Sequence, residues 1–233
     1  MLLITCMALA NADALRDAGE VVDGPAALVI ITPGIASDAY NGWVEAIESR
    51  GMDAWVFEAD PASSSASIGA ALASASAALA AERGAISVAA HGWGGVYALT
   101  AGIAPERLAL VGVPLGAHAV AGPLDGERWP WETSLLGAMP PAKAPAGALD
   151  AYRDWVSDFP DYTAPTAPTL LIASNMDAVA PPEVVRLPSM GWPQRTWERA
   201  GFLSLSGADP SHGELLQDSA IARRVAEFLE EGE

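Results

Sequence analysis

Short apolar runs alternate along the chain with longer segments of helical pattern, and this alternation restricts the fold more than any other sequence feature. The runs are four to six residues long and almost entirely apolar, as expected of strands buried on both faces of a parallel sheet. A βαβ series of this kind predicts an α/β fold, with a mostly parallel sheet covered by helices on both faces. The predicted strands are residues 27–32, 54–57, 85–90, 108–113 and 169–173.

The segments between these strands have the length of crossover helices, and the last one closes the chain as a surface helix. At 233 residues, 51% of them hydrophobic, the chain is long enough to bury one core, so we expect a single domain over residues 1–233. One long interruption, rich in Pro and Trp, covers residues 116–168. The predicted helices are residues 39–50, 65–83, 93–104 and 214–231.

The charge balance excludes one class of partner. The chain has 29 Asp and Glu against 12 Lys and Arg, a formal net charge of −17, which repels phosphate backbones and argues against nucleic acid. Cys6 is the single cysteine, and the three histidines are far apart in the sequence, so we predict neither a disulfide nor a metal site. There is no Gly-x-Gly-x-x-Gly or phosphate-loop pattern, and we expect no cofactor.

The first twelve residues are an apolar run that ends in the Ala-x-Ala sequence of residues 10–12. This end resembles the tail of a signal peptide, although the basic segment that precedes such a run is missing. If it is the remnant of a signal peptide, the protein is exported. If it is a first strand and turn of the mature fold, the protein is cytoplasmic, which we favour. No segment is long and apolar enough to predict a membrane span.

Residues 90–95, Ala-His-Gly-Trp-Gly-Gly, join a predicted strand to a predicted helix. In a nucleophile elbow, small flanking residues such as Ala90 and Gly94 let the strand and helix backbones approach, and the residue between them carries the attacking atom. That residue is Gly92, where Ser, Cys or Asp is expected. Glycine adopts the positive φ of an elbow without the strain of about 1–3 kcal/mol that a side chain incurs. We expect His91 to pack beneath this turn.

Two further motifs follow in the order acid, then base. Asp177 lies in an Asp-Ala-Val-Ala-Pro loop after a predicted strand, and His212 lies in Asp-Pro-Ser-His-Gly just ahead of the last helix. A carboxylate that accepts the Nδ1 proton of an imidazole fixes its tautomer and leaves Nε2 to take a proton. Two plainer interpretations stay open: a loop or capping carboxylate for Asp177, and a surface or core histidine for His212.

The order of elbow, Asp177 and His212, over residues 27–231, resembles the α/β-hydrolase superfamily. The resemblance implies the α/β-hydrolase fold with a short cap at about residues 116–168. It also implies catalytic roles for Asp177 and His212, with Gly92 at the nucleophile position. The elbow is similar as well to the His-Asp-Trp-Gly-Gly elbow of epoxide hydrolases and haloalkane dehalogenases, in which Asp is the nucleophile.

Residues 32–35, Thr-Pro-Gly-Ile, end the first predicted strand where the superfamily usually has His-Gly. The resemblance implies an oxyanion hole made by the backbone N–H groups of Ile35 and Trp93. A simple strand-to-helix turn would explain the same residues. The resemblance also places Gly34, Trp93 and Tyr152 in the ligand pocket, with Trp93 as an aromatic wall.

The glycine at the elbow leaves open whether the protein is an enzyme. We favour a non-catalytic or vestigial hydrolase that binds a small apolar or acyl ligand or a protein partner, by analogy with the N-myc downstream-regulated family, whose elbow also lacks a nucleophile. The alternative is a divergent hydrolase of an ester or related bond, in which Asp177 and His212 activate water. A third interpretation is an engineered glycine. A nucleophile relocated to Ser37, Ser174 or Ser211 is disfavoured, because none of them lies on an elbow.

Overall fold

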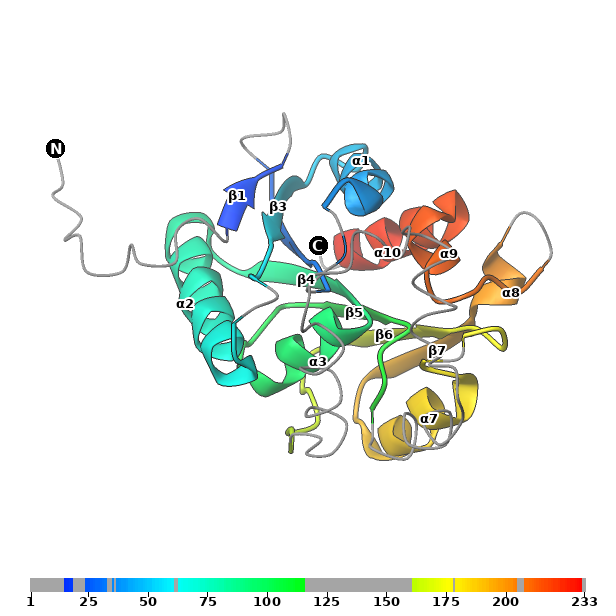
Figure 1. Cartoon of the computed structure of the whole chain (residues 1–233). Coiled ribbons are helices and arrows are strands. Elements are labelled where there is room, and N and C mark those ends of the chain that lie inside the picture. Colours follow the sequence, from blue (N-terminus) through cyan, green and yellow to red (C-terminus); the bar gives the residue numbers. More distant parts are fainter. Residues whose placement is uncertain are drawn as a thin grey trace, which may run out of the picture.

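Across the described residues of the computed structural model, a seven-stranded sheet runs in the order β1-β3-β2-β4-β5-β6-β7 (Figure 1). β1 pairs with β3 in antiparallel orientation, and every other neighbouring pair is parallel. The structure describes residues 15–18, 24–32, 35, 37–60, 63–115, 161–177, 179–204 and 208–231. The strands are β1 (Leu15–Asp17), β2 (Ala26–Ile30), β3 (Asp53–Phe57), β4 (Ile86–His91), β5 (Leu108–Val111), β6 (Thr169–Ala173) and β7 (Arg195–Arg199).

Helices cover both faces of this sheet (Figure 1). α1 (Asn41–Glu48) and α10 (Ser219–Glu230) pack on one face, and α2 (Ser65–Arg83) and α3 (Trp93–Thr100) pack on the other. The remaining helical segments are short and lie in the connections between these strands and helices. They are η2 (Ser37–Tyr40), α7 (Pro182–Arg186), η4 (Pro188–Gly191), α8 (Ala200–Leu203) and α9 (Glu214–Gln217).

The central strands are apolar on both sides because each face contributes to its own hydrophobic core. In β2, Leu28 and Ile30 belong to the core under α2 and α3, whereas Ala27 and Val29 belong to the core under α1 and α10. All five residues of β2 are buried. This is why the sequence shows apolar runs here rather than alternation, and the mostly parallel sheet with helices on both faces that those runs predicted is confirmed.

The predicted strands and helices are present, but three details were wrong. The helix predicted at residues 214–231 is two helices, because the backbone at Asp218 is extended and its carboxylate accepts hydrogen bonds from the N–H groups of Ala220 (2.8 Å) and Ile221 (3.2 Å). The helix predicted to reach residue 104 ends at Thr100. The edge strands β1 and β7 were not predicted, and β7 is partly exposed and rich in charge.

The cap predicted at residues 116–168 lies almost wholly outside the described residues, so the cap and the domain boundaries stay predictions. Its last residues return to the sheet, where the Tyr162 hydroxyl donates to the carbonyl of Leu115 just beyond β5 (2.8 Å). The apolar N-terminal run is also outside the described residues. In the part of the chain that is described, no helix combines the length and hydropathy needed to cross a membrane.

Candidate active site

The turn between β4 and α3 has the geometry of a nucleophile elbow. Gly92 follows β4 directly and has φ +52° and ψ −128°, in the left-handed half of backbone space that non-glycine residues adopt only under strain. Its N–H donates to the carbonyl of Val111 on β5 (3.1 Å), and its own carbonyl accepts from the N–H of Gly95 in α3 (3.1 Å). The chain therefore changes from strand to helix within a single residue, as predicted.

Small residues after the turn are required by close packing of α3 on the sheet. A β-carbon on Gly94 would lie 2.6 Å from the carbonyl oxygen of Ile30 at the end of β2. A β-carbon on Gly95 would overlap the side chain of Val113. Real β-carbons do not come this close to other atoms. Glycine at these two positions therefore lets the helix approach the neighbouring strand ends. The close approach at Gly94 is the one expected from the elbow motif, and Gly95 is a second such position that the sequence analysis did not single out.

Asp177 and His212 form a buried hydrogen-bonded pair at the same edge of the sheet. The Nδ1–H of His212 donates to Oδ2 of Asp177 at 2.8 Å, and both side chains are at most 2% exposed. The other oxygen, Oδ1, accepts from the N–H groups of Val179 (2.8 Å) and Ala180 (2.9 Å). Since the carboxylate can only accept, the neutral imidazole presents Nε2 as its acceptor. This arrangement holds the imidazole as a general base.

The loops that carry this pair are also joined to each other. Asn175, two residues before the acid, donates from Nδ2 to Oδ2 of Asp209, three residues before the base (2.6 Å). Its amide oxygen accepts from Nη2 of Arg199 at the end of β7 (3.2 Å). The acid loop and the base loop are therefore held together at a second point outside the acid–base pair.

His212 lies directly over Gly92. A β-carbon built on Gly92 would stand 2.9 Å from Nε2 of His212, 3.3 Å from its Cε1 and 3.1 Å from Oγ1 of Thr32. The structure therefore brings together the elbow, the acid and the base that the sequence singled out. It also adds Thr32, to which the sequence analysis gave no role of its own at the end of the first predicted strand.

Gly112, just after β5, is a second glycine on which the pair depends. Its φ is +57°, and a β-carbon there would lie 2.8 Å from Oδ2 of Asp177 and 3.2 Å from Nδ1 of His212. The same β-carbon would stand 2.9 Å from Leu215 in α9. The hydrogen bond between acid and base therefore needs glycine at this strand end. The sequence analysis missed Gly112, and the available signal was a glycine near the end of an otherwise apolar predicted strand.

His91 packs beneath the elbow, as predicted, and contacts the base. Its ring centroid is 4.3 Å from that of His212, and its Nε2–H donates to the backbone carbonyl of His212 (2.9 Å). Complete burial, followed by repulsion from His212, holds the pKa of His91 well below its usual value of 6.5. His91 is thus a neutral ring that supports the loop carrying the base.

Thr32 connects the loop after β2 to the elbow. Its backbone N–H donates to the hydroxyl of Tyr40 (2.9 Å), a buried side chain whose pKa is raised to about 12 by burial. Its Oγ1 donates to the carbonyl of His91 and accepts a longer hydrogen bond from the N–H of Gly94 (3.4 Å). The Thr32 side chain is 1% exposed, so this hydroxyl is held inside the turn.

The predicted oxyanion hole and pocket are described only in part. The N–H of Ile35 donates to the carbonyl of Thr32 (3.1 Å), so its use in an oxyanion hole stays a prediction that requires this bond to open. Trp93 is the first residue of α3 and is 5% exposed. Gly34 and Tyr152 lie outside the described residues, so their assignment to the pocket stays a prediction as well.

The three serines considered as relocated nucleophiles do not supply any of the three atoms nearest a β-carbon on Gly92, which belong to His212 and Thr32. Ser174 Oγ accepts a hydrogen bond from the N–H of Met176 inside the acid loop (3.2 Å).

Within the described ranges, no three His, Cys, Asp or Glu side chains gather as a metal ion would require.

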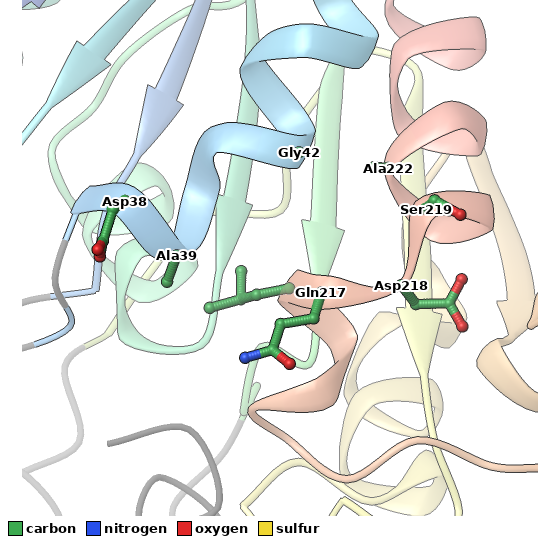
Figure 2. Close-up of a pocket in the computed structure, with 8 residues that line it drawn as sticks. Asp38, Ala39, Gly42, Gln217, Asp218, Ser219 and Ala222 are labelled. Atoms are coloured by element: carbon green, nitrogen blue, oxygen red, sulfur yellow. The ribbon is translucent and has the colours of Figure 1, made fainter. Parts of the chain in front are cut away.

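A surface pocket of about 420 Å³ lies between the start of α1, the end of α9 and the start of α10 (Figure 2). Its lining includes neither Gly92, Asp177 nor His212. Two carboxylates, Asp38 and Asp218, stand at its two ends, and Asp218 is already used as the cap of α10. We therefore place the candidate active site at the elbow and not in this pocket.

Comparison with solved structures establishes the fold. A thermophilic esterase from Thermogutta terrifontis superposes with a TM-score of 0.64 at 17% sequence identity, covering 94% of this chain and 93% of the esterase. A hydrolase from Oleispira antarctica gives a TM-score of 0.62 at 13% identity, with 93% of each chain covered. This chain has the α/β-hydrolase fold. In the α/β-hydrolase fold the acid and the base follow the elbow in chain order, as Asp177 and His212 do here.

A thioesterase from the prodiginine biosynthetic pathway of Streptomyces coelicolor has the same α/β-hydrolase fold, with a TM-score of 0.56 at 16% identity and coverage of 93% of this chain and 96% of the thioesterase. No protein-family model matches the sequence, and no curated protein matches it either. At these identities the likeness extends to the fold, so the function has to be argued from the site.

Proposed function

We propose that this protein binds a small, mainly apolar acyl or ester-like molecule at the elbow and forms no covalent acyl intermediate with it. The observation that carries the proposal is the buried Asp177–His212 pair, with a hydrogen bond of 2.8 Å, directed at a glycine. Acyl-enzyme chemistry requires an attacking atom at the elbow, and Gly92 has no side chain to supply one.

The nature of the ligand is argued from the surroundings of the elbow. Beside the polar pair, Trp93 follows Gly92 in the chain and Leu215 lies close to Gly112, and both side chains are buried. An apolar wall with a few convergent polar groups is typical of small-molecule sites. The α/β-hydrolase-fold neighbours described as an esterase, a hydrolase and a thioesterase support an acyl group as the ligand's reactive part.

A second candidate function is slow, water-dependent ester hydrolysis. It is favoured by one observation: the acid–base pair has the hydrogen bonding needed for a general base, including two backbone N–H groups that hold Asp177. In serine hydrolases stripped of the triad, the remaining parts of the site still give roughly 10³–10⁴-fold acceleration over water. A water molecule activated by His212 would use the same pair without any covalent step.

The first test measures hydrolysis of short- and medium-chain p-nitrophenyl esters by the unmodified protein and by His212→Ala, from mildly acidic to mildly alkaline pH. Equal rates from the two proteins support a binding role. A rate that His212→Ala abolishes overturns the non-catalytic role and establishes water-dependent hydrolysis.

Two further measurements address the binding step and the covalent step. A fluorophosphonate probe should leave the protein unlabelled, and labelling in the elbow would contradict the absence of a covalent intermediate. Isothermal titration with medium-chain methyl ketones, which resemble esters but cannot be hydrolysed, should detect binding that weakens in Trp93→Ala. The matched control is Trp192→Ala, which removes a comparably buried indole that packs against Tyr162.

A further inference from the structure

Two polar atoms lie close to the place where other elbows carry the β-carbon of a nucleophile. Oγ1 of Thr32 and Nε2 of His212 lie 3.1 Å and 2.9 Å from a β-carbon built on Gly92. They approach this point from different parts of the chain, Thr32 from the loop after β2 and His212 from the loop before α9. Gly92 is therefore flanked by a hydroxyl and an imidazole nitrogen.

The hydrogen-bond inventory makes both atoms acceptors. The proton of the Thr32 hydroxyl is donated to the carbonyl of His91, so its two lone pairs remain, of which one accepts a long bond from the N–H of Gly94 (3.4 Å). The Nδ1 proton of His212 is donated to Asp177, so Nε2 of the neutral imidazole has a lone pair. A small molecule with two O–H donors satisfies both acceptors at once.

We propose that Thr32 Oγ1 and His212 Nε2 together bind one water molecule over Gly92, and that this water is the nucleophile of the protein. The proposal deepens the second candidate function and rests on it. A water that donates one proton to each acceptor has its lone pairs directed away from both of them, toward a bound carbonyl carbon. Thr32 is then a catalytic residue, because it touches the attacking molecule.

The reaction balances with water as the only co-reactant. The water oxygen forms a bond to the carbonyl carbon of an ester while one of its protons passes to His212 Nε2. The tetrahedral intermediate then loses the alcohol: the bond between that carbon and the alcohol oxygen breaks, and the imidazolium returns its proton to that oxygen. The products are a carboxylic acid and an alcohol, and Asp177 and His212 return to their starting state.

The direct test is a high-resolution crystal structure of the unmodified protein without ligand. We expect an ordered water within about 3.2 Å of both Thr32 Oγ1 and His212 Nε2. The same water should be missing from Thr32→Val, which keeps the side-chain shape and loses the hydroxyl, while the bond between His212 and Asp177 is kept. The absence of such a water from the unmodified protein, or its persistence in Thr32→Val, overturns the proposal.

The kinetic test compares Thr32→Val with two matched variants. Thr32→Val should lower the His212-dependent kcat/KM for p-nitrophenyl esters about tenfold or more, whereas Thr32→Ser should restore it to within about threefold. Thr100→Val removes another hydroxyl, one that donates to the carbonyl of Val96 inside α3 and lies away from the site, and should change nothing. A folded Thr32→Val with the full rate, or a Thr32→Ser as slow as Thr32→Val, overturns the role of Thr32.

These outcomes separate the inference from the proposed function. If the water is present but no ester hydrolysis depends on His212, the hydrolysis candidate fails and so does the nucleophilic role of the water. If hydrolysis depends on His212 while no water bridges the two atoms, the function stands and the role of Thr32 fails. Circular dichroism of each variant confirms that the comparison is made on folded protein.

Discussion

The imidazole of His212 lies against Gly92 so closely that a β-carbon on Gly92 would stand 2.9 Å from Nε2. Real β-carbons essentially never come this near to another heavy atom. The position of the base and the glycine at the elbow therefore depend on each other. Any side chain at residue 92 requires the imidazole to move, so residue 92 affects both stability and chemistry.

Gly92→Ala should destabilise the protein more than Gly102→Ala. Both glycines have positive φ, +52° and +69°, so alanine adds backbone strain of about 1–3 kcal/mol at each position. Only at Gly92 does the new β-carbon also meet His212 and Thr32, because the β-carbon on Gly102 has no neighbour within 4 Å. Urea denaturation gives the two free energies of unfolding. Equal losses in the free energy of unfolding in the two variants would show that His212 moves away from the new β-carbon at no cost.

Gly92→Ser should not produce an efficient serine esterase. The serine β-carbon would stand 2.9 Å from Nε2 of His212, which leaves no room for the hydroxyl beyond it to donate its proton to Nε2. The backbone would also carry the strain of a positive φ. We expect slow labelling by a fluorophosphonate probe and no burst of p-nitrophenol. The double variant Gly92→Ser with His212→Ala is the control. A burst that this control lacks would mean that the loop of His212 gives way readily.

Gly112→Ala should separate the acid from the base. Its β-carbon would stand 2.8 Å from Oδ2 of Asp177 and 3.2 Å from Nδ1 of His212, the two atoms that share the hydrogen bond. The downfield NMR signal of that shared proton should disappear or shift, and any activity that depends on His212 should fall. Gly102→Ala, with a similar φ and open space around it, is again the matched control. An unchanged signal in Gly112→Ala would contradict the packing described for this strand end.

Acid should destabilise the protein through His91. Burial holds the pKa of His91 well below 6.5 in the folded state, so below about pH 6.5 only the unfolded chain takes up this proton. The contribution of the neutral ring to stability is therefore complete above pH 6.5 and is lost progressively as the pH falls. The two titratable side chains whose rings face it are His212 and Tyr40.

The variant His91→Gln isolates this effect, since glutamine keeps an N–H donor for the carbonyl of His212. Between pH 6.5 and 5, the free energy of unfolding of the unmodified protein should fall more steeply than that of His91→Gln, by up to about 1.4 kcal/mol per pH unit. Denaturation curves at several pH values measure the two slopes. If the free energy of unfolding falls equally with pH in both proteins, other titratable groups cause the loss of stability in acid.

The elbow, the acid and the base could be predicted because each is marked by a local pattern. Gly92 is enclosed by small residues between an apolar run and a helix, Asp177 follows another apolar run, and His212 precedes the last helix. The parallel order of the strands then brings the strand-end residues to one edge of the sheet. Local pattern and topology together were sufficient for these three positions.

Thr32 and Gly112 could not be assigned in the same way, because their roles come from contacts between distant segments. Thr32 acts through the carbonyl of His91, 59 residues further along the chain, and Gly112 matters only because Asp177 and His212 approach it. The edge strand β7 escaped prediction for a related reason: its sequence has no apolar pattern, and it is held by pairing with β6. Contacts between distant segments, and not the local sequence pattern, decide these positions.

The hydrogen bond between Asn175 and Asp209 bears on how the site opens. It ties the loop of the acid to the loop of the base at a point separate from their own contact. Displacing one of these loops alone would therefore break this exposed side-chain bond as well as the bond between His212 and Asp177. Two bonds at separate points therefore favour movement of the acid loop and the base loop together over movement of either loop alone.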